Sequence, residues 1–416
     1  MKNKVLICAY ACLSAPDKRF NLVDGGEGSL GWSIVKQLDR FFQLIVLTHK
    51  DNKQYIESKI VKEPLLNTKF IYFGLPSWVE GLQKIYGGVQ IYAYLWQIKA
   101  YFVARKLHRE NNFDIFHHVT FANDWMASFV GALLPIPYMR GPGGGAHKVP
   151  EGFVKKYKFN QKIAERVRSI GQWLFRHDPF FIIGQNRSKV LLVCNYEAKN
   201  AISKKWQSKV YFFPVNGISL EDLPLIDYAN ENSNHFLILT AGRLIKIKEI
   251  DLAIRAFKLL SDKVLEARFV ILGDGPEINN LKNIVKSLKL ENKVLFKGWL
   301  ARENVLKQMA DCDVFLFPSL RDGGGNVVVE AMASGKPVIC FDLAGPGFHI
   351  DENCGIKIKP ENPKQAVKDM AEALEKLYLD KDLRLRLGQG ARKKAEKEYD
   401  WDKLGDRLFE IYKKVL

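Results

Sequence analysis

Apolar residues along the chain form short runs that are separated by longer polar and glycine-rich stretches. Runs of this length, bounded by turn residues, are typical of buried β-strands with partners on both sides. A strand followed by a glycine-rich loop and a helical stretch indicates an α/β fold. The expected strands are 5–11, 44–48, 69–73, 113–119 and 190–194 in the first half, and 236–241, 269–272, 293–296, 313–317 and 339–341 in the second.

The run at 313–317 is followed by the densest group of candidate functional residues. Glycines 323–325 let the backbone turn sharply and leave its N–H groups open to a ligand. We expect Asn326 to be the N-cap of a helix over 327–334, whose N-terminus carries a partial positive charge. The backbone here is therefore a predicted anion site. Its expected members are Gly324, Gly325, Asn326 and Val327.

Two acids flank this predicted anion site, Asp322 before the glycines and Glu330 inside the helix, with seven residues between them. Carboxylates would repel a phosphate, so they suit hydroxyl groups on either side of one. A diphosphate with a sugar at one end and a ribose at the other fits that pattern. Taken singly, Asp322 would be interpreted as a turn cap and Glu330 as a solvated helix residue.

The arrangement of acid, seven residues and Glu330 ahead of Ala-Met-Ala-Ser-Gly-Lys-Pro-Val-Ile resembles the signature of retaining nucleotide-sugar glycosyltransferases of family 4. That family usually has glutamate where this chain has Asp322. The resemblance implies the GT-B fold, in which two Rossmann-like α/β domains face a cleft. It also implies sugar transfer from a UDP- or GDP-linked donor, with retention of configuration and without a cofactor or metal.

A second motif follows the run at 236–241, where Gly242, Arg243 and Lys248 stand at a strand end. Glycine permits close approach, arginine grips a phosphate with two hydrogen bonds and lysine adds a movable charge. The motif resembles the family's G-R-L-x-x-x-K-G, with Glu249 in place of the last glycine. By that resemblance Arg243 and Lys248 neutralise the leaving diphosphate.

Other glycine loops follow other expected strands. Gly26 and Glu27 resemble a G-S-E-x-x-x-G-W loop of part of the family, with Gly26 in place of serine. Gly273 and Gly275 stand where the family frames the nucleotide base. We therefore include all four residues among the donor-binding candidates.

His117 and His118 are expected at the carboxyl end of the strand over 113–119, where an open α/β sheet binds its ligand. The family commonly has a histidine here that contacts the donor sugar. A lone histidine is more often a satisfied core group, so both interpretations are kept. Which of the two faces the donor is also left open.

With 416 residues, the chain is expected to form two domains. We expect an acceptor-binding domain over 1–215, a nucleotide-sugar domain over 216–395 and a final helix over 396–416 that crosses back. Residues 1–220 hold 31 Lys+Arg against 15 Asp+Glu, a net of +16, whereas 221–416 hold 32 against 31, a net of +1. The basic first half suggests an anionic partner.

Residues 151–190 carry nine Lys+Arg against three acids, interleaved with aromatics. This composition suits a bilayer interface, or equally a basic solvated face over an aromatic core. The expected acceptor is a saccharide or a polyprenyl-diphosphate-linked sugar, with an anionic membrane surface as a further partner. Nucleic acid is not expected, because no recognition motif accompanies the charge.

The six cysteines form no C-x2-C pair, which fits reduced thiols in a cytoplasmic protein. A peripheral position on the inner face of the plasma membrane is a further expectation.

Taken together, the motifs and their resemblance predict a metal-independent hexosyltransferase for bacterial surface polysaccharide. Two alternatives remain: a nucleotide-sugar hydrolase or epimerase of the same fold, and a non-enzymatic polysaccharide- or membrane-binding protein.

Overall fold

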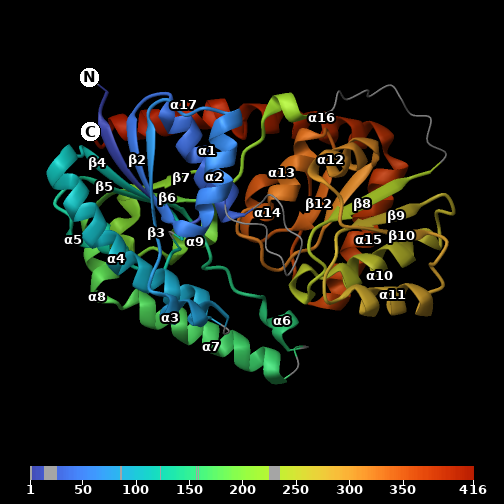
Figure 1. The fold of residues 1–416 in the computed structure, drawn as a ribbon. Helices are drawn as coiled ribbons and strands as arrows, with labels where there is room; N and C mark the ends of the chain where they lie inside the picture. Colours follow the sequence, from blue (N-terminus) through green and yellow to red (C-terminus); the bar gives the residue numbers. More distant parts are fainter. Residues whose placement is uncertain are drawn as a thin grey trace. The chain divides into compact units, whose positions relative to one another are not determined.

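The computed structural model describes residues 2–13, 26–84, 87–121, 123–155, 157, 159–223 and 235–416. The chain divides into two compact units, each with its own parallel β-sheet between layers of helices (Figure 1). Unit 1 comprises Met1–Ala146, Ile163–Val215 and Trp401–Leu416, and unit 2 comprises His147–Lys162 and Asn216–Asp400. The expected α/β class, with two parallel-sheet domains, is confirmed.

Unit 1 holds a seven-stranded sheet in the order β3-β2-β1-β4-β5-β6-β7. The strands are β1 Lys4–Ala9, β2 Gln43–His49, β3 Thr68–Phe73, β4 Ile115–Thr120, β5 Tyr138–Gly143, β6 Ser188–Val193 and β7 Val210–Phe212. The longer helices are α1 Glu27–Asp39, α2 Lys53–Lys62, α4 Gly88–Asn111, α7 Phe159–Arg176, α8 Pro179–Arg187 and α17 Trp401–Lys413. The shorter ones are α3 Ser77–Glu80, α5 Phe129–Leu133 and α9 Tyr196–Ala201.

Unit 2 holds a six-stranded parallel sheet in the order β10-β9-β8-β11-β12-β13. Its strands are β8 Leu237–Ala241, β9 Arg268–Leu272, β10 Val294–Gly298, β11 Val314–Phe317, β12 Val338–Phe341 and β13 Gly355–Ile358. Its helices are α6 Glu151–Val154, α10 Ile250–Ser261, α11 Ile278–Ser287, α12 Arg302–Asp311, α13 Asn326–Ala333, α14 Ala344–His349, α15 Pro363–Leu379 and α16 Lys381–Glu398.

The inner strands β11 and β12 of unit 2 are apolar throughout because both faces of the sheet are covered there. Along β11, Val314 and Leu316 join one core, whereas Phe315 and Phe317 join the core on the opposite face. This alternation is the two-residue period of a strand. A continuous apolar run is therefore what a strand buried on both faces needs, and such runs located the strands in the sequence.

Two segments belong to a different unit from the residues that adjoin them in the sequence. The C-terminal helix α17 belongs to unit 1, where Phe409 stacks on Phe41 with ring centroids 4.3 Å apart. Residues 147–162 belong to unit 2, although the sequence boundary at 215 had placed them in the first domain. The reason is packing, since Val149 and Phe153 are buried in a core of the second unit.

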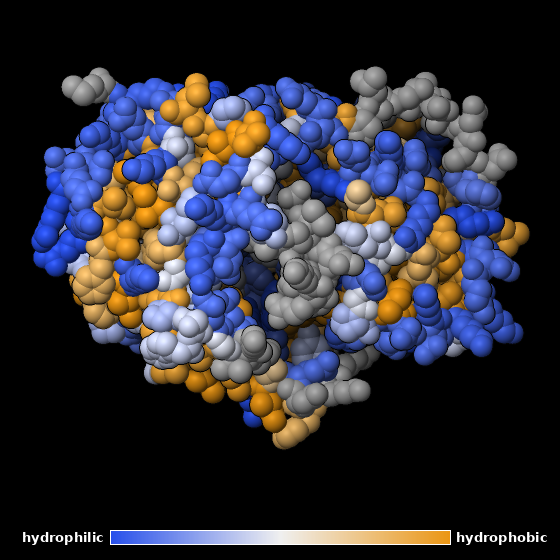
Figure 2. Space-filling model, viewed as in Figure 1, coloured by the Kyte–Doolittle hydropathy of each residue, from blue (hydrophilic) through white to orange (hydrophobic). Residues whose placement is uncertain are grey.

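Helix α7 carries an exposed apolar stripe within unit 1. Ile163, Val167, Ile170 and Leu174 recur at helical spacing, and all four are exposed. Trp173 lies beside them and is 58% exposed. Figure 2 shows apolar side chains gathered along this helix at the lower edge of the view. In the described parts of the chain, none of the helices combines the length and apolarity needed to cross a membrane.

Candidate active site

The candidate active site of unit 2 lies at the carboxyl ends of β8 and β11. These two strands are neighbours in the sheet, and the strand order reverses between them. In open α/β sheets, ligands bind at such a reversal, outside the carboxyl ends of the strands. Gly242 and Arg243 follow β8, and Asp322 follows β11, so the fold brings two distant sequence motifs to one edge.

Asp322 and Lys248 form a nearly buried ion pair, with Lys248 Nζ 2.5 Å from Asp322 Oδ2. The ammonium group also lies 4.7 Å from the centre of the Phe317 ring. The other carboxylate oxygen, Oδ1, accepts a hydrogen bond of 2.7 Å from the N–H of Gly325. Burial alone would raise the pKa of Asp322, but Lys248 and the Gly325 N–H outweigh it and hold the pKa below its usual value.

Helix α13 begins at Asn326, and its N-cap is Gly325, with a φ of 62°. The expectation that Asn326 caps this helix was therefore wrong by one position. Glycine is favoured at the cap because its left-handed backbone conformation strains other residues. In addition, a Cβ at Gly325 would lie 3.2 Å from the His349 ring. The N–H groups of Asn326 and Val327, in the first helical turn, point away from any carbonyl of their own helix.

The carbonyl oxygen of Gly324 is held by two side chains. Asn216 Nδ2 donates to it, and so does His349 Nε2 at 2.6 Å. Because a carbonyl can only accept, Nε2 must carry the proton, and His349 Nδ1 accepts from the Tyr399 hydroxyl at 2.8 Å. Burial lowers the pKa of His349 to about 4, so the ring is neutral near pH 7.

Glu330 is held by an arginine that the sequence analysis missed. Arg302, the first residue of α12, donates from Nε to Glu330 Oε1 at 3.1 Å and from Nη1 to Asp222 at 2.9 Å. Burial raises the pKa of Glu330, and the charge of Arg302 opposes that rise. The pairing orients the carboxylate through one oxygen.

His147 is a further missed neighbour of the glycine loop. Its Cε1 would lie 3.4 Å from a Cβ at Gly323, and its charge, when protonated, would lower the pKa of Asp322. The sequence offered no signal for this proximity, because the expected boundary at 215 places His147 in the first domain. The side chain is buried beside the candidate anion site.

Gly273 and Gly275 have a structural reason to be glycine. A Cβ at Gly273 would lie 1.9 Å from the carbonyl oxygen of Gly242, and one at Gly275 would lie 2.4 Å from that of Leu244. The loops after β8 and β9 therefore pack backbone against backbone. This packing accounts for both glycines without a ligand and places Gly242 beside them.

In unit 1, His117 and His118 both lie within β4, which continues to Thr120. His117 Nε2 donates to the Gly141 carbonyl at 2.8 Å, and its Nδ1 accepts from the Tyr412 hydroxyl at 2.7 Å. His118 Nε2 lies 3.2 Å from the amide nitrogen of Gln97. Burial lowers the pKa of His117 to about 4 and that of His118 to about 3. These contacts are those of neutral core histidines.

The other candidates of unit 1 begin helix α1. Gly26 is the N-cap of α1, with a φ of 73°, and Glu27 is the first helical residue. The Glu27 carboxylate accepts a hydrogen bond from the backbone N–H of Phe121, which follows β4. Residues 14–25, which precede them in the sequence, lie outside the described residues.

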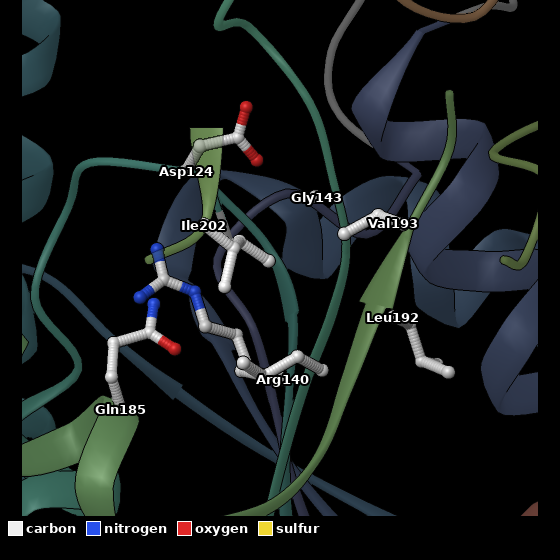
Figure 3. A pocket seen from close by; sticks show the side chains of 8 residues that line it. Asp124, Arg140, Gly143, Gln185, Leu192, Val193 and Ile202 are labelled. Atoms are coloured by element: carbon white, nitrogen blue, oxygen red, sulfur yellow. The ribbon is translucent and has the colours of Figure 1, made fainter. Parts of the chain in front are cut away.

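A small pocket in unit 1, lined by three polar and several apolar residues, was not predicted. Arg140 of β5 lies between the side chains of Asp124 and Gln185 (Figure 3). The other lining residues are Gly143, Leu191, Leu192, Val193 and Ile202. The cavity has room for about one water molecule. Burial raises the pKa of Asp124 to about 6, and Arg140 opposes that rise.

The family of glycosyl transferases group 1 matches residues 226–394. An uncharacterised glycosyltransferase of Methanocaldococcus jannaschii is 25% identical over 323 residues, covering 73% of this chain and 76% of that protein. The N-acetylgalactosamine-N,N'-diacetylbacillosaminyl-diphospho-undecaprenol 4-alpha-N-acetylgalactosaminyltransferase of Campylobacter jejuni is 34% identical over 170 residues. That match covers 39% of this chain and 43% of the relative, so the alignment spans less than half of it.

Solved structures share the fold over the whole chain. A glycosyltransferase from Rickettsia africae has a TM-score of 0.65 at 15% identity, covering 100% of this chain and 98% of that one. Anabaena HepE, crystallised with UDP and glucose, has a TM-score of 0.62 at 15% identity, covering 99% of both chains. Residues 226–394 therefore resemble the glycosyl transferases of group 1, and the chain has the GT-B fold.

Proposed function

We propose that unit 2 binds a nucleotide-diphosphate sugar, linked to UDP or GDP, and that the enzyme transfers its sugar to an acceptor held by unit 1. One observation carries the proposal. Lys248 pairs with Asp322 beside the start of helix α13, where the strand order reverses, and Glu330 lies one turn further along that helix. That edge combines positive charge and helix amides for a diphosphate with carboxylates for hydroxyl groups.

Each part of the donor has a matching group. Lys248 and Arg243 supply positive charge for the diphosphate, together with the amides of Asn326 and Val327. The Glu330 carboxylate accepts hydrogen bonds from the ribose hydroxyls. Asp322 accepts a hydrogen bond from a sugar hydroxyl. For this, Lys248 must release the Asp322 carboxylate oxygen with which it is paired.

In the proposed reaction the bond between the anomeric carbon and the diphosphate oxygen breaks, and the diphosphate keeps the electron pair. The positive groups stabilise that developing charge without a metal. The acceptor hydroxyl attacks from the face that the diphosphate leaves, and its proton passes to a diphosphate oxygen. Retention of configuration follows from this same-face attack.

The relatives favour a lipid-linked or polysaccharide acceptor. The Campylobacter jejuni relative is named for a diphospho-undecaprenol substrate, and a Staphylococcus aureus relative is named CapM of capsular polysaccharide biosynthesis. We therefore propose a role in bacterial surface polysaccharide synthesis, on a saccharide or polyprenyl-diphosphate acceptor. The test is incubation with UDP- and GDP-sugars and such acceptors. Release of nucleoside diphosphate that survives a chelator supports the proposal, and binding without release refutes it.

The acceptor would place the enzyme at a membrane surface, and the stripe on α7 suits that site. Its exposed apolar side chains, from Ile163 to Leu174, would enter the interface between headgroups and acyl chains. Arg166 is exposed beside the stripe, and residues 151–190 have a net charge of +6. A basic amphipathic helix of this kind favours an anionic bilayer over a neutral one.

A further inference from the structure

One peptide group connects the core of unit 2 to the candidate donor site. The carbonyl of Gly324 and the N–H of Gly325 belong to the same planar trans peptide, so they point in opposite directions. The carbonyl is held on its side by His349 and Asn216. The N–H consequently points to Asp322 Oδ1, to which it donates at 2.7 Å.

The hydrogen bonds run in one direction, from Tyr399 through His349 and the Gly324 peptide to Asp322. The Tyr399 hydroxyl donates to His349 Nδ1, which leaves the proton of the neutral ring on Nε2. That proton engages the Gly324 carbonyl and sets the plane of the peptide. The peptide N–H fixes one oxygen of Asp322, and the other oxygen is thereby presented to Lys248 at 2.5 Å.

Two backbone contacts hold the rest of this loop in place. The Gly345 N–H donates to the Asp322 carbonyl at 2.9 Å. A Cβ at Gly345 would lie 2.7 Å from the carbonyl oxygen of Gly323, so α14 packs directly on the loop. His349 is the last residue of α14 and is 1% exposed. The loop is therefore clamped from its buried side.

We propose that Tyr399 and His349 are positioning residues for donor binding, because they fix the peptide that orients Asp322 and Lys248. The proposal rests on the proposed function of unit 2 as the donor site. Neither side chain needs to touch the donor. Their effect reaches it through the Gly324 peptide and the ion pair.

Unit 1 supplies a matched control, because His117 has the same two kinds of partner. Its Nε2 donates to the Gly141 carbonyl, its Nδ1 accepts from Tyr412, and its ring is fully buried. Removing the hydroxyl of Tyr412 therefore breaks the same type of hydrogen bond in a similar environment. The difference is that Tyr412 belongs to the other unit.

The experiment compares Tyr399→Phe with Tyr412→Phe, using UDP and GDP as probes in titration calorimetry and thermal unfolding as the control for stability. We expect Tyr399→Phe to raise the dissociation constant of the bound nucleotide about fivefold, as loss of one buried hydrogen bond implies. Tyr412→Phe should lower the melting temperature similarly and leave that dissociation constant unchanged.

Two variants of His349 sharpen the test. His349→Gln can still donate to the Gly324 carbonyl and should retain most of the affinity, whereas His349→Phe cannot and should lose at least tenfold. Unchanged affinity in Tyr399→Phe, or equal losses in Tyr399→Phe and Tyr412→Phe, would overturn the positioning role alone. A wild-type protein that binds neither nucleotide would overturn the donor-site proposal as well, so the two failures are distinguishable.

Discussion

Lys248 Nζ and Asp322 Oδ2 are 2.5 Å apart, although the two residues are separated by 74 positions in the sequence. Each follows a strand of the same sheet, and those strands, β8 and β11, are neighbours. The ion pair places a positive charge beside the first turn of α13. In the proposed enzyme, that charge is what the leaving diphosphate requires.

Lys248→Ala should lower the rate of nucleoside diphosphate release by about 100-fold, the usual effect of removing one donor to a developing negative charge. The measurement is initial rate at saturating donor. Lys246→Ala is the matched control, because Lys246 lies on the same turn and is also ion-paired, to Asp251 at 3.1 Å. Near wild-type turnover in Lys248→Ala, or an equal loss in Lys246→Ala, would contradict the assignment.

Arg302→Ala should change the pH dependence of donor binding. Burial raises the pKa of Glu330 and Arg302 opposes it, so removing Arg302 should raise that pKa further. A protonated carboxyl accepts ribose hydrogen bonds poorly. As the pH is lowered from neutral, the KM for the donor should therefore begin to rise at a higher pH than in the wild type. Arg302→Lys keeps the charge and should follow the wild-type profile more closely, and identical profiles for all three proteins would refute this role.

Asp124 predicts a pH dependence of stability in unit 1. Burial raises its pKa to about 6 in the folded protein, above the usual 3.8. Between those values the folded state binds a proton that the unfolded state has lost, so the free energy of unfolding falls as the pH rises from about 4 to 6. The loss is at most about 3 kcal/mol.

Asp124→Asn removes this titration. Its melting temperature relative to that of the wild type should therefore increase as the pH rises through that range. Other groups titrate alike in both proteins, so the difference isolates Asp124. If the melting temperature of Asp124→Asn minus that of the wild type stays constant or decreases as the pH rises, Asp124 does not have the raised pKa.

The stripe on α7 predicts binding to vesicles that contain phosphatidylglycerol, and weaker binding to pure phosphatidylcholine or at high salt. Because Trp173 is exposed on that face, its fluorescence should shift to shorter wavelength on binding. Ile170→Asp should weaken binding at least tenfold. Ser169→Asp adds the same charge to the same helix away from the stripe and should have a smaller effect, and equal affinities for all three proteins would exclude α7 as the contact.

The sequence predicted the strands that carry this site because each is buried on both faces and therefore almost entirely apolar. It also selected Asp322, Glu330, Arg243 and Lys248 as candidates, because each stands at a fixed spacing from a strand or helix end, and the structure pairs two of them, Lys248 and Asp322. Contacts that form only in the folded chain could not be predicted from the sequence. Arg302, His349, Asn216 and Tyr399 come from segments far from the glycines, and no local pattern marks them.

The errors have physical causes too. Asn326 is a residue type that is favoured at the N-cap. The left-handed backbone at Gly325 and the packing of His349 against Gly325 move the cap by one residue. For His117 the sequence left two interpretations open, a donor-sugar contact or a satisfied core group, and in the structure its two ring nitrogens contact Gly141 and Tyr412. The position of a residue in a strand predicts whether its side chain is buried. It does not predict which groups form hydrogen bonds with a buried polar side chain.

The most direct test of the central claim is binding of UDP- and GDP-linked sugars to the wild type, to Glu330→Ala and to Arg243→Ala, measured by calorimetry with circular dichroism to verify folding. We predict that the wild type binds at least one of these donors, and that both variants remain folded and bind it at least tenfold more weakly. Folded variants that bind the donor as tightly as the wild type would contradict the assignment of the donor site to unit 2.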